Sequence, residues 1–188
     1  MSATEDQRTG AEATRSTQPA LFGLEAAGAS DIGYRGQTAC TAAGISYRQL
    51  DYWARTNLVE PSVRPAQGSG TQRLYSFSDI LLLKVVKRLL DTGVSLQNIR
   101  LAIDHLRGRG KADLTGLTLL SDGTTVYACT STDEVIDLVQ GGQGVFGIAV
   151  GRVITEVEGT LAELPAERVG DSALGDELAE RRRRRTSA

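Results

Sequence analysis

The chain has 188 residues, of which 40% are hydrophobic, and its net charge is −2. This length allows one large domain or two small ones, with enough apolar residues to bury a core. No apolar run approaches the roughly 18 to 20 residues of a membrane span, and residues 1–9 are too polar for a signal peptide. Two cysteines give no disulfide framework, so we expect a protein of the reducing cytoplasm.

The charge is unevenly distributed along the chain. Residues 1–33 carry 2 basic and 5 acidic side chains, residues 34–107 carry 10 and 5, and residues 108–188 carry 9 and 13. The differences are −3, +5 and −4, which sum to the net charge of −2. A positive middle segment between acidic flanks is typical of a segment that meets nucleic-acid phosphates.

Residues 1–32 are polar and rich in small side chains, so we expect them to be disordered. Gln18, Leu21 and Phe22 form an apolar island in this tail. They either pack on the chain itself, serve no purpose, or form a docking peptide. The pattern resembles the short peptides by which bacterial proteins bind the DNA polymerase sliding clamp.

Two short helices joined by a tight turn are predicted next. The first covers residues 37–43, and Gly44 supplies the backbone conformation that the turn needs. Ser46 and Gln49 form a capping box that fixes the start of the second helix. That helix stops at Asn57, which tolerates the left-handed conformation.

A β-hairpin is predicted after the second helix. Pro61 opens it, residues 68–70 (Gly-Ser-Gly) form its tip, and residues 72–75 form its return strand. A helix-turn-helix followed by such a wing is a reader of duplex DNA. The predicted DNA contacts are Tyr47, Arg48, Gln49, Tyr52 and Arg55 on the second helix and Arg64, Arg73 and Tyr75 on the wing.

Five segments in this region resemble the MerR family of bacterial transcription regulators. They are residues 50–53 (Leu-Asp-Tyr-Trp), 57–59 (Asn-Leu-Val), 61–64 (Pro-Ser-Val-Arg), 73–75 (Arg-Leu-Tyr) and 93–99 (Gly-Val-Ser-Leu-Gln-Asn-Ile). The resemblance implies a dimer that binds a promoter palindrome and distorts the duplex so that RNA polymerase can engage it.

One position departs from the family pattern, and a closer likeness extends further along the chain. Asp51 stands where the family usually carries a phosphate-contacting Arg, so Arg48 or Arg55 is expected to replace that contact. Residues 34–36, 47–56 and 141–148 also resemble an actinobacterial branch of the family that is linked to control of growth and cell division.

Two further helices complete the predicted DNA-binding domain, residues 33–108. Ser78 and Asp79 start a helix whose apolar residues recur at helical spacing, and Ser95 caps the next helix. The family commonly continues into a long dimerising helix, whereas residues 107–110 (Arg-Gly-Arg-Gly) predict a flexible link. The expected fold class is mainly α with small β elements: a winged helix-turn-helix, then a small α+β domain, with disordered tails.

The second domain is expected at residues 112–165. Strands are predicted at residues 117–120 and 124–128, joined by a hairpin turn, with a helix from about residue 131 to 140. A further short strand is predicted at residues 145–149.

An apolar seam at heptad spacing follows, and we interpret it as the dimerisation surface. Gly151 and Gly159 weaken the helix prediction, so a second hairpin is the alternative. Residues 166–188 are expected to be disordered, with Arg181 to Arg185 as a solvated tail or a phosphate-binding arm. The seam consists of Val150, Ile154, Val157, Leu161 and Leu164.

No motif in the chain indicates catalysis. The GxxxxGK[ST] and HExxH patterns are absent, and His105 lies within a predicted helix. Cys40 and Cys129 lie in different predicted domains, so we expect no metal site. Because the motifs above are absent, we also expect no cofactor and no enzymatic activity. The leading prediction is a DNA-binding transcription regulator located at the nucleoid. Two alternatives stay open: a ligand-sensing switch in the second domain, and a DNA-bound adaptor that recruits the sliding clamp through the N-terminal tail.

Overall fold

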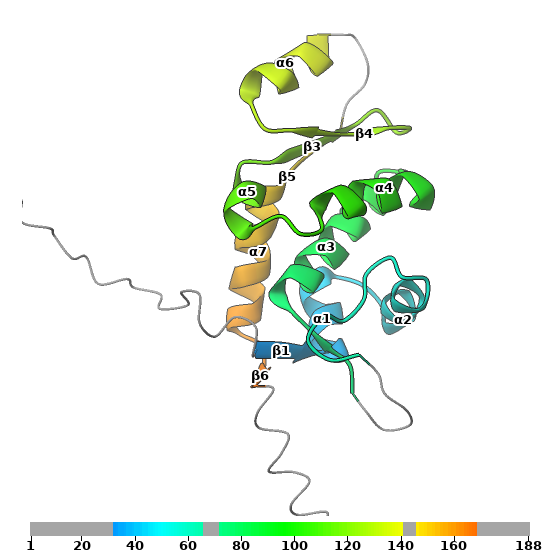
Figure 1. The fold of residues 1–188 in the computed structure, drawn as a ribbon, viewed down its shortest axis with the longest axis vertical. Helices are drawn as coiled ribbons and strands as arrows, with labels where there is room; N and C mark the ends of the chain where they lie inside the picture. The colour runs from blue at the N-terminus through cyan, green and yellow to red at the C-terminus, as the bar shows by residue number, and fades with distance from the viewer. Residues whose placement is uncertain (1–31, 66–71, 141–145, 169–188) are drawn as a thin grey trace, which may run out of the picture.

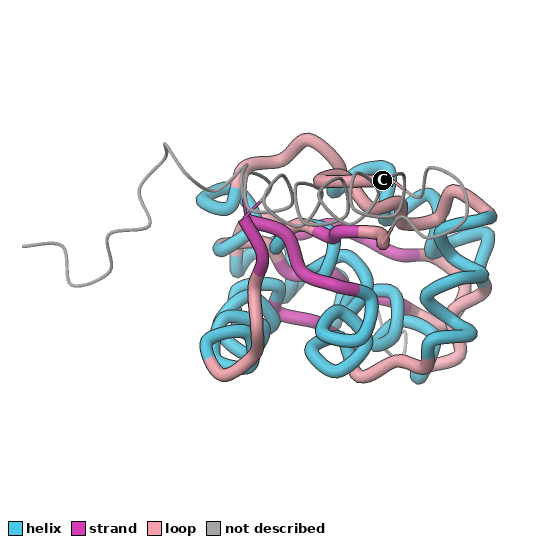
Figure 2. Tube along the Cα trace, turned by 90° about the horizontal axis from the view of Figure 1, so that it is seen from below, coloured by secondary structure: helices cyan, strands magenta, loops and turns pink. Residues whose placement is uncertain are grey.

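The computed structural model describes residues 32–65, 72–140 and 146–168. The elements in chain order are β1 (Ile32–Arg35), α1 (Gly36–Ala43), α2 (Tyr47–Arg55), β2 (Leu74–Tyr75), α3 (Phe77–Asp91), α4 (Leu96–Leu106), α5 (Lys111–Thr115), β3 (Thr118–Ser121), β4 (Val126–Cys129), α6 (Thr132–Gln140), β5 (Phe146–Ala149), α7 (Val150–Ala162) and β6 (Glu167–Arg168). Helices α1 to α4 form one end of the fold, and the sheet of β3, β4 and β5 with helix α6 forms the other end. Helix α7 runs from one end to the other (Figure 1). Two small sheets lie toward opposite ends of the fold (Figure 1), and helices surround their strands when the molecule is seen from below (Figure 2).

The predicted helix-turn-helix is confirmed in its local details. Gly44 ends α1 in the left-handed conformation with φ 72°, and Asn57 follows α2 with φ 56°. Both halves of the capping box are formed, since the Gln49 N–H donates to Ser46 Oγ at 3.2 Å and the Ser46 N–H donates to Gln49 Oε1 at 2.9 Å. These bonds satisfy backbone donors that the first turn of α2 leaves without helical partners.

The next helix begins earlier than the sequence predicted. Its N-cap is Ser76 and not Ser78, because Ser76 Oγ accepts from the Asp79 N–H at 3.1 Å and Asp79 Oδ2 accepts from the Ser76 N–H at 2.8 Å. Asp79 is 7% exposed and also accepts from Ser62, which ties the base of the wing to α3. Both Ser76 and Ser78 precede an apolar stripe, so the sequence alone could not separate them.

The antiparallel hairpin of the C-terminal half is confirmed. Strands β3 and β4 pair from Thr118↔Cys129 to Ser121↔Val126, and β5 pairs with the other edge of β3, giving the order β4-β3-β5. Leu119 and Ile148 face each other and belong to the main core. Helix α6 lies over the sheet on the side away from α7 and has no buried residue, leaving Ile136 and Val139 exposed (Figure 1).

A second small sheet was not predicted. Its order is β2-β1-β6, with Tyr34 opposite Tyr75 and Ile32 opposite Arg168. The expectation of disorder is therefore wrong for Glu167 and Arg168 within residues 166–188, and for Ile32 within residues 1–32. A two-residue strand has no recognisable pattern of its own, because it is defined by its partner strand.

The apolar seam forms helix α7, so the hairpin alternative is wrong. Its members are not available for dimerisation in this structure, because four of the five are buried inside their own chain and the fifth packs against the same core. Helix α7 packs on α1, α3 and α5, and its core residues belong to the same cluster as those of the DNA-binding end. The core is thus continuous across the predicted domain boundary at residues 108–112. Exposures are 0% for Val150, 3% for Ile154, 0% for Val157 and 6% for Leu161, and Leu164 is half-buried against the same core.

The link after α4 is more ordered than predicted. Arg107 donates to the carbonyl oxygens of Asn57 and Leu58 at 3.0 and 2.7 Å, and the short helix α5 follows. Helix α5 then lies against the start of α7, where a Cβ on Gly151 would meet the Thr115 carbonyl oxygen at 2.5 Å. Glycine at this position therefore permits the close approach of two helices.

Several predicted features lie outside the described residues. They are the tail peptide with Gln18, Leu21 and Phe22, the wing tip at 68–70, the glycine-rich segment 141–144, and Arg181 to Arg185. Among the described helices, none is long and apolar enough to cross a membrane.

Candidate nucleic-acid interface

Helix α2 has one buried face and one open face. Leu50 and Trp53 are 1% and 2% exposed and pack into the core, which fixes the orientation of the helix. The opposite face carries Tyr47 and Tyr52, which are 61% and 49% exposed. Large aromatic side chains at such exposure are unusual on a folded surface, and they mark this face as a candidate contact surface.

Arg48 lies on the same open face. Its side chain is exposed and forms no ion pair or hydrogen bond with any residue that the structure describes. Gln49, in contrast, is half-buried, and its side-chain oxygen is used by the Ser46 cap. Of these two predicted contacts, Arg48 is free to reach a ligand and Gln49 has a structural task.

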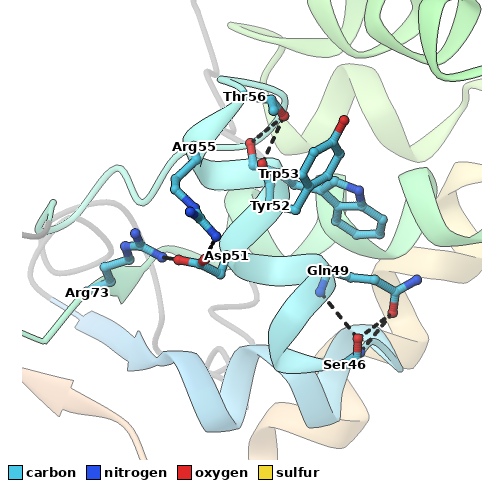
Figure 3. Close-up of polar contacts among 8 residues, drawn as sticks. All are labelled: Ser46, Gln49, Asp51, Tyr52, Trp53, Arg55, Thr56 and Arg73. Carbon is cyan, nitrogen blue, oxygen red and sulfur yellow. Dashed lines mark hydrogen bonds and ion pairs between the residues drawn. The ribbon is translucent and has the colours of Figure 1, made fainter.

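Asp51 links α2 to the wing (Figure 3). Its Oδ2 pairs with Arg55 on the same helix, and its Oδ1 accepts from Arg73 Nη1 at 2.9 Å. The Arg73 hydrogen bond and the Arg55 charge hold the pKa of Asp51 below its usual range. Two predicted DNA contacts, Arg55 and Arg73, thus share one carboxylate.

Tyr75 does not belong to the surface, which corrects its assignment as a DNA contact. It is 0% exposed and belongs to the hydrophobic core, in the strand β2 that pairs with β1. Burial raises its pKa to about 12, although the nearby Arg73 guanidinium acts in the opposite direction. Its hydroxyl forms no hydrogen bond of normal geometry with the described residues.

The base of the wing is closed by one bridge, and only Leu74 and Tyr75 of the predicted return strand form a strand, which pairs with β1. Arg64 and Leu74 exchange backbone hydrogen bonds at 3.1 and 2.9 Å. The Arg64 side chain donates to the Gln72 carbonyl oxygen at 3.1 Å and lies 3.9 Å from the carboxylate of Glu167. Glu167 also pairs with Arg35, so β6 brings a negative charge to the base of the wing.

Residues 34–106, which include α2 and the base of the wing, match the family model of the MerR HTH family regulatory protein. An uncharacterized HTH-type transcriptional regulator of Mycobacterium tuberculosis is 61% identical over 179 residues, covering 93% of this chain and 80% of the relative. A regulator with the same kind of name from Mycobacterium bovis is equally similar.

The chain belongs to the MerR family. Members of this family are DNA-binding transcriptional regulators, and this MerR-family chain has the family's helix-turn-helix in α1 and α2. A more distant relative, the heavy metal-dependent transcription regulator 1 of Rhizobium meliloti, is 30% identical over 45% of this chain and 56% of its own length. The match to a solved MerR-family transcriptional regulator from Bacillus cereus spans 44% of this chain and 57% of the solved chain, with 23% sequence identity and a TM-score of 0.34.

A cleft of about 640 Å³ in this MerR-family chain lies between the base of the wing, the start of α3 and the link after α4. Ser62, Asp79 and Arg107 line it, and all three already hold backbone or side-chain partners. Within the described ranges, no group of three or more His, Cys, Asp or Glu could hold a metal ion.

The sequence shows that Asp51 departs from the MerR pattern but does not show both of its partners. The Asp51–Arg55 pair has i,i+4 spacing, which predicts an ion pair on a helix. The pair with Arg73 joins residues 22 positions apart, and no local pattern encodes it. Glu167 was missed for the same reason, because its partner Arg35 lies 132 positions away.

Proposed function

We propose that the chain binds specific promoter sequences in duplex DNA and controls transcription from them. The observation that carries this proposal is the open face of α2, where Tyr47, Arg48 and Tyr52 stand uncovered beside the wing. A recognition helix places such side chains against base edges in the major groove. The charge of residues 34–107, 10 basic against 5 acidic, supports the same assignment through attraction to phosphates.

The roles of the basic residues follow from their surroundings. Arg48 has no partner among the described residues, so it is assigned to a base edge, for which guanine is the usual partner of Arg. Arg55, Arg64 and Arg73 are assigned to phosphates. The Asp51 carboxylate holds Arg55 and Arg73 beside α2, and the Gln72 carbonyl oxygen and Glu167 hold Arg64 at the base of the wing.

The regulator acts as a dimer on a palindrome and distorts the duplex for RNA polymerase, as the family resemblance implies. The dimer does not use the buried stripe of α7, so its surface lies elsewhere on the molecule. The promoters are those of growth and cell-division genes, a proposal that rests on the resemblance to the actinobacterial branch. Chromatin immunoprecipitation of the tagged protein would identify these promoters, and sedimentation would give the oligomeric state.

Selection from a pool of random duplexes tests the central proposal. The parent chain is expected to enrich a defined motif, and Arg48→Ala should relax the preference at one base pair by about 1–3 kcal/mol. Arg152→Ala is the matched control, because Arg152 is an exposed arginine on α7, outside the proposed surface. Failure of the parent chain to enrich any motif, or equal motifs from parent and Arg48→Ala, would contradict the assignment.

A further inference from the structure

The carboxylate of Asp51 lies between two guanidiniums that come from different elements. Arg55 follows it by one turn of α2, and Arg73 precedes the short strand β2 (Figure 3). Arg55 is 70% exposed, whereas Arg73 is 23% exposed and Asp51 is 27% exposed. The wing is thus attached to the recognition helix through a partly sheltered ion pair, with one guanidinium left facing solvent.

The three side chains carry a combined charge of +1 rather than +2. Arginine pairs with carboxylate and phosphate oxygens in the same planar geometry, so Asp51 occupies the positions that a DNA phosphate would take. Without this carboxylate, two guanidiniums would each attract a phosphate of any duplex. With it, the general attraction of this face falls by one charge, whatever the base sequence.

Specific and non-specific complexes depend on this carboxylate in opposite ways. A non-specific complex is held by the charge of the face and tolerates loosely placed side chains. A specific complex needs the wing and the recognition helix at a fixed spacing, so that phosphate contacts set the register for base contacts. Asp51 supplies that fixed spacing because one of its carboxylate oxygens accepts from Arg55 on α2 and the other accepts from Arg73 on the wing.

We propose that Asp51 is a specificity-determining residue, which fixes Arg73 of the wing against Arg55 of α2 and lowers the attraction of this face for non-specific DNA. Asp51 acts through the two arginines and is therefore a positioning residue. This inference rests on the proposed DNA-binding function.

The test compares Asp51→Asn with the parent chain on two duplexes, the motif selected by the parent and a scrambled duplex. Asparagine keeps the size and one acceptor oxygen but removes the charge. The salt dependence for the scrambled duplex is expected to steepen by about 0.9 in log–log slope, one additional phosphate. Affinity for that duplex should then fall about three-fold more between 50 and 200 mM salt than it does for the parent.

The ratio of selected to scrambled affinity is the deciding quantity. At low salt this ratio should fall at least about three-fold in Asp51→Asn. The reason is that the affinity for the scrambled duplex rises, whereas the affinity for the selected duplex does not rise by the same factor. Asp51→Glu restores the charge and should bring the ratio back toward that of the parent. Asp133→Asn is the matched control, since Asp133 is exposed on α6 at the other end of the molecule and the substitution changes net charge equally.

The outcomes separate this inference from the proposed function. A parent chain that selects no motif overturns both. A parent that selects a motif, together with an Asp51→Asn variant whose ratio equals that of parent and Asp133→Asn, overturns only the role of Asp51. The same holds if Asp51→Asn weakens both duplexes equally while its melting temperature falls, because that pattern indicates a purely structural residue.

Discussion

At the scale of single residues, side chains of similar chemistry have different tasks because their burial differs. Tyr47 and Tyr52 are exposed on α2, whereas Tyr75 is fully buried and its hydroxyl forms no hydrogen bond of normal geometry with the described part of the chain. A buried polar group without a partner costs free energy, since it has lost its hydrogen bonds to water. Arg48 and Arg73 differ in the same way: Arg48 is exposed and has no partner within the described ranges, whereas Arg73 is held by Asp51.

Replacing Tyr75 by Phe tests whether this residue serves the core or the DNA. The substitution removes only the hydroxyl, so the free energy of unfolding is expected to stay unchanged or rise by up to about 1 kcal/mol. Urea unfolding measures this change, and DNA affinity should remain that of the parent. Tyr47→Phe is the control at an exposed position, where stability should not change. A clear loss of DNA affinity in Tyr75→Phe would return the residue to the interface.

At the scale of elements, α7 shows how two glycines in one helix can have different effects. A Cβ at Gly151 would lie 2.5 Å from the Thr115 carbonyl oxygen, whereas a Cβ at Gly159 would meet nothing within 4 Å. The first glycine permits α5 to approach the start of α7. The second has no contact that explains it, so it only lowers the helix propensity.

Alanine substitutions at these two positions are therefore expected to have opposite signs. Gly151→Ala should destabilise the protein by about 1–3 kcal/mol, because a backbone carbonyl must move. Gly159→Ala should stabilise it by about 0.5–1 kcal/mol through helix propensity. Chemical unfolding of the two variants beside the parent gives both values. Stabilisation by both substitutions would show that α5 does not lie against α7 as described.

At the scale of the whole molecule, α7 joins the two ends of the fold through apolar and charged contacts. Lys84 of α3 is 12% exposed, donates to the Ala42 carbonyl oxygen at 2.9 Å and pairs with Glu156 of α7 at 2.7 Å. Arg88 pairs with the same carboxylate. The hydrogen bond from Lys84 is the main cause that holds the pKa of Glu156 below its usual range, and the positive charges of Lys84 and Arg88 act in the same direction.

This lowered pKa predicts how the contact responds to acid. The ionised carboxylate is stabilised in the folded state, so its contribution is present at neutral pH and is lost as pH falls through the folded-state pKa. Glu156→Gln should lower stability at pH 7 by about 1 kcal/mol or less, because the carboxylate is about half exposed. The difference from the parent should shrink below about pH 4.

Thermal melting at pH 7 and in acid measures this difference. Glu163→Gln is the control, since Glu163 is an exposed carboxylate at the end of α7 without an ion pair among the described residues. If Glu156→Gln is less stable than the parent by the same amount in acid as at pH 7, the carboxylate acts through its shape and not through its charge.

The features that the sequence determined correctly are local ones. Ser46 and Gln49 are three residues apart and bond within one helical turn, and the left-handed conformations at Gly44 and Asn57 depend on those residues alone. The hairpin of β3 and β4 likewise needs only a turn between two adjacent apolar segments. These signals predicted the open face of α2, and with it most of the candidate interface.

The tertiary structure decided which surfaces the predicted elements meet. The spacing of Val150, Ile154, Val157 and Leu161 shows that one face of a helix is apolar, but it does not show whether that face meets another subunit or α1 and α3 of the same chain. The same limit applies to Tyr75, to β6 and to the pairing of Asp51 with Arg73. Each depends on residues that are distant in sequence and come together only when the core closes, since periodicity and capping describe a segment and not its neighbours.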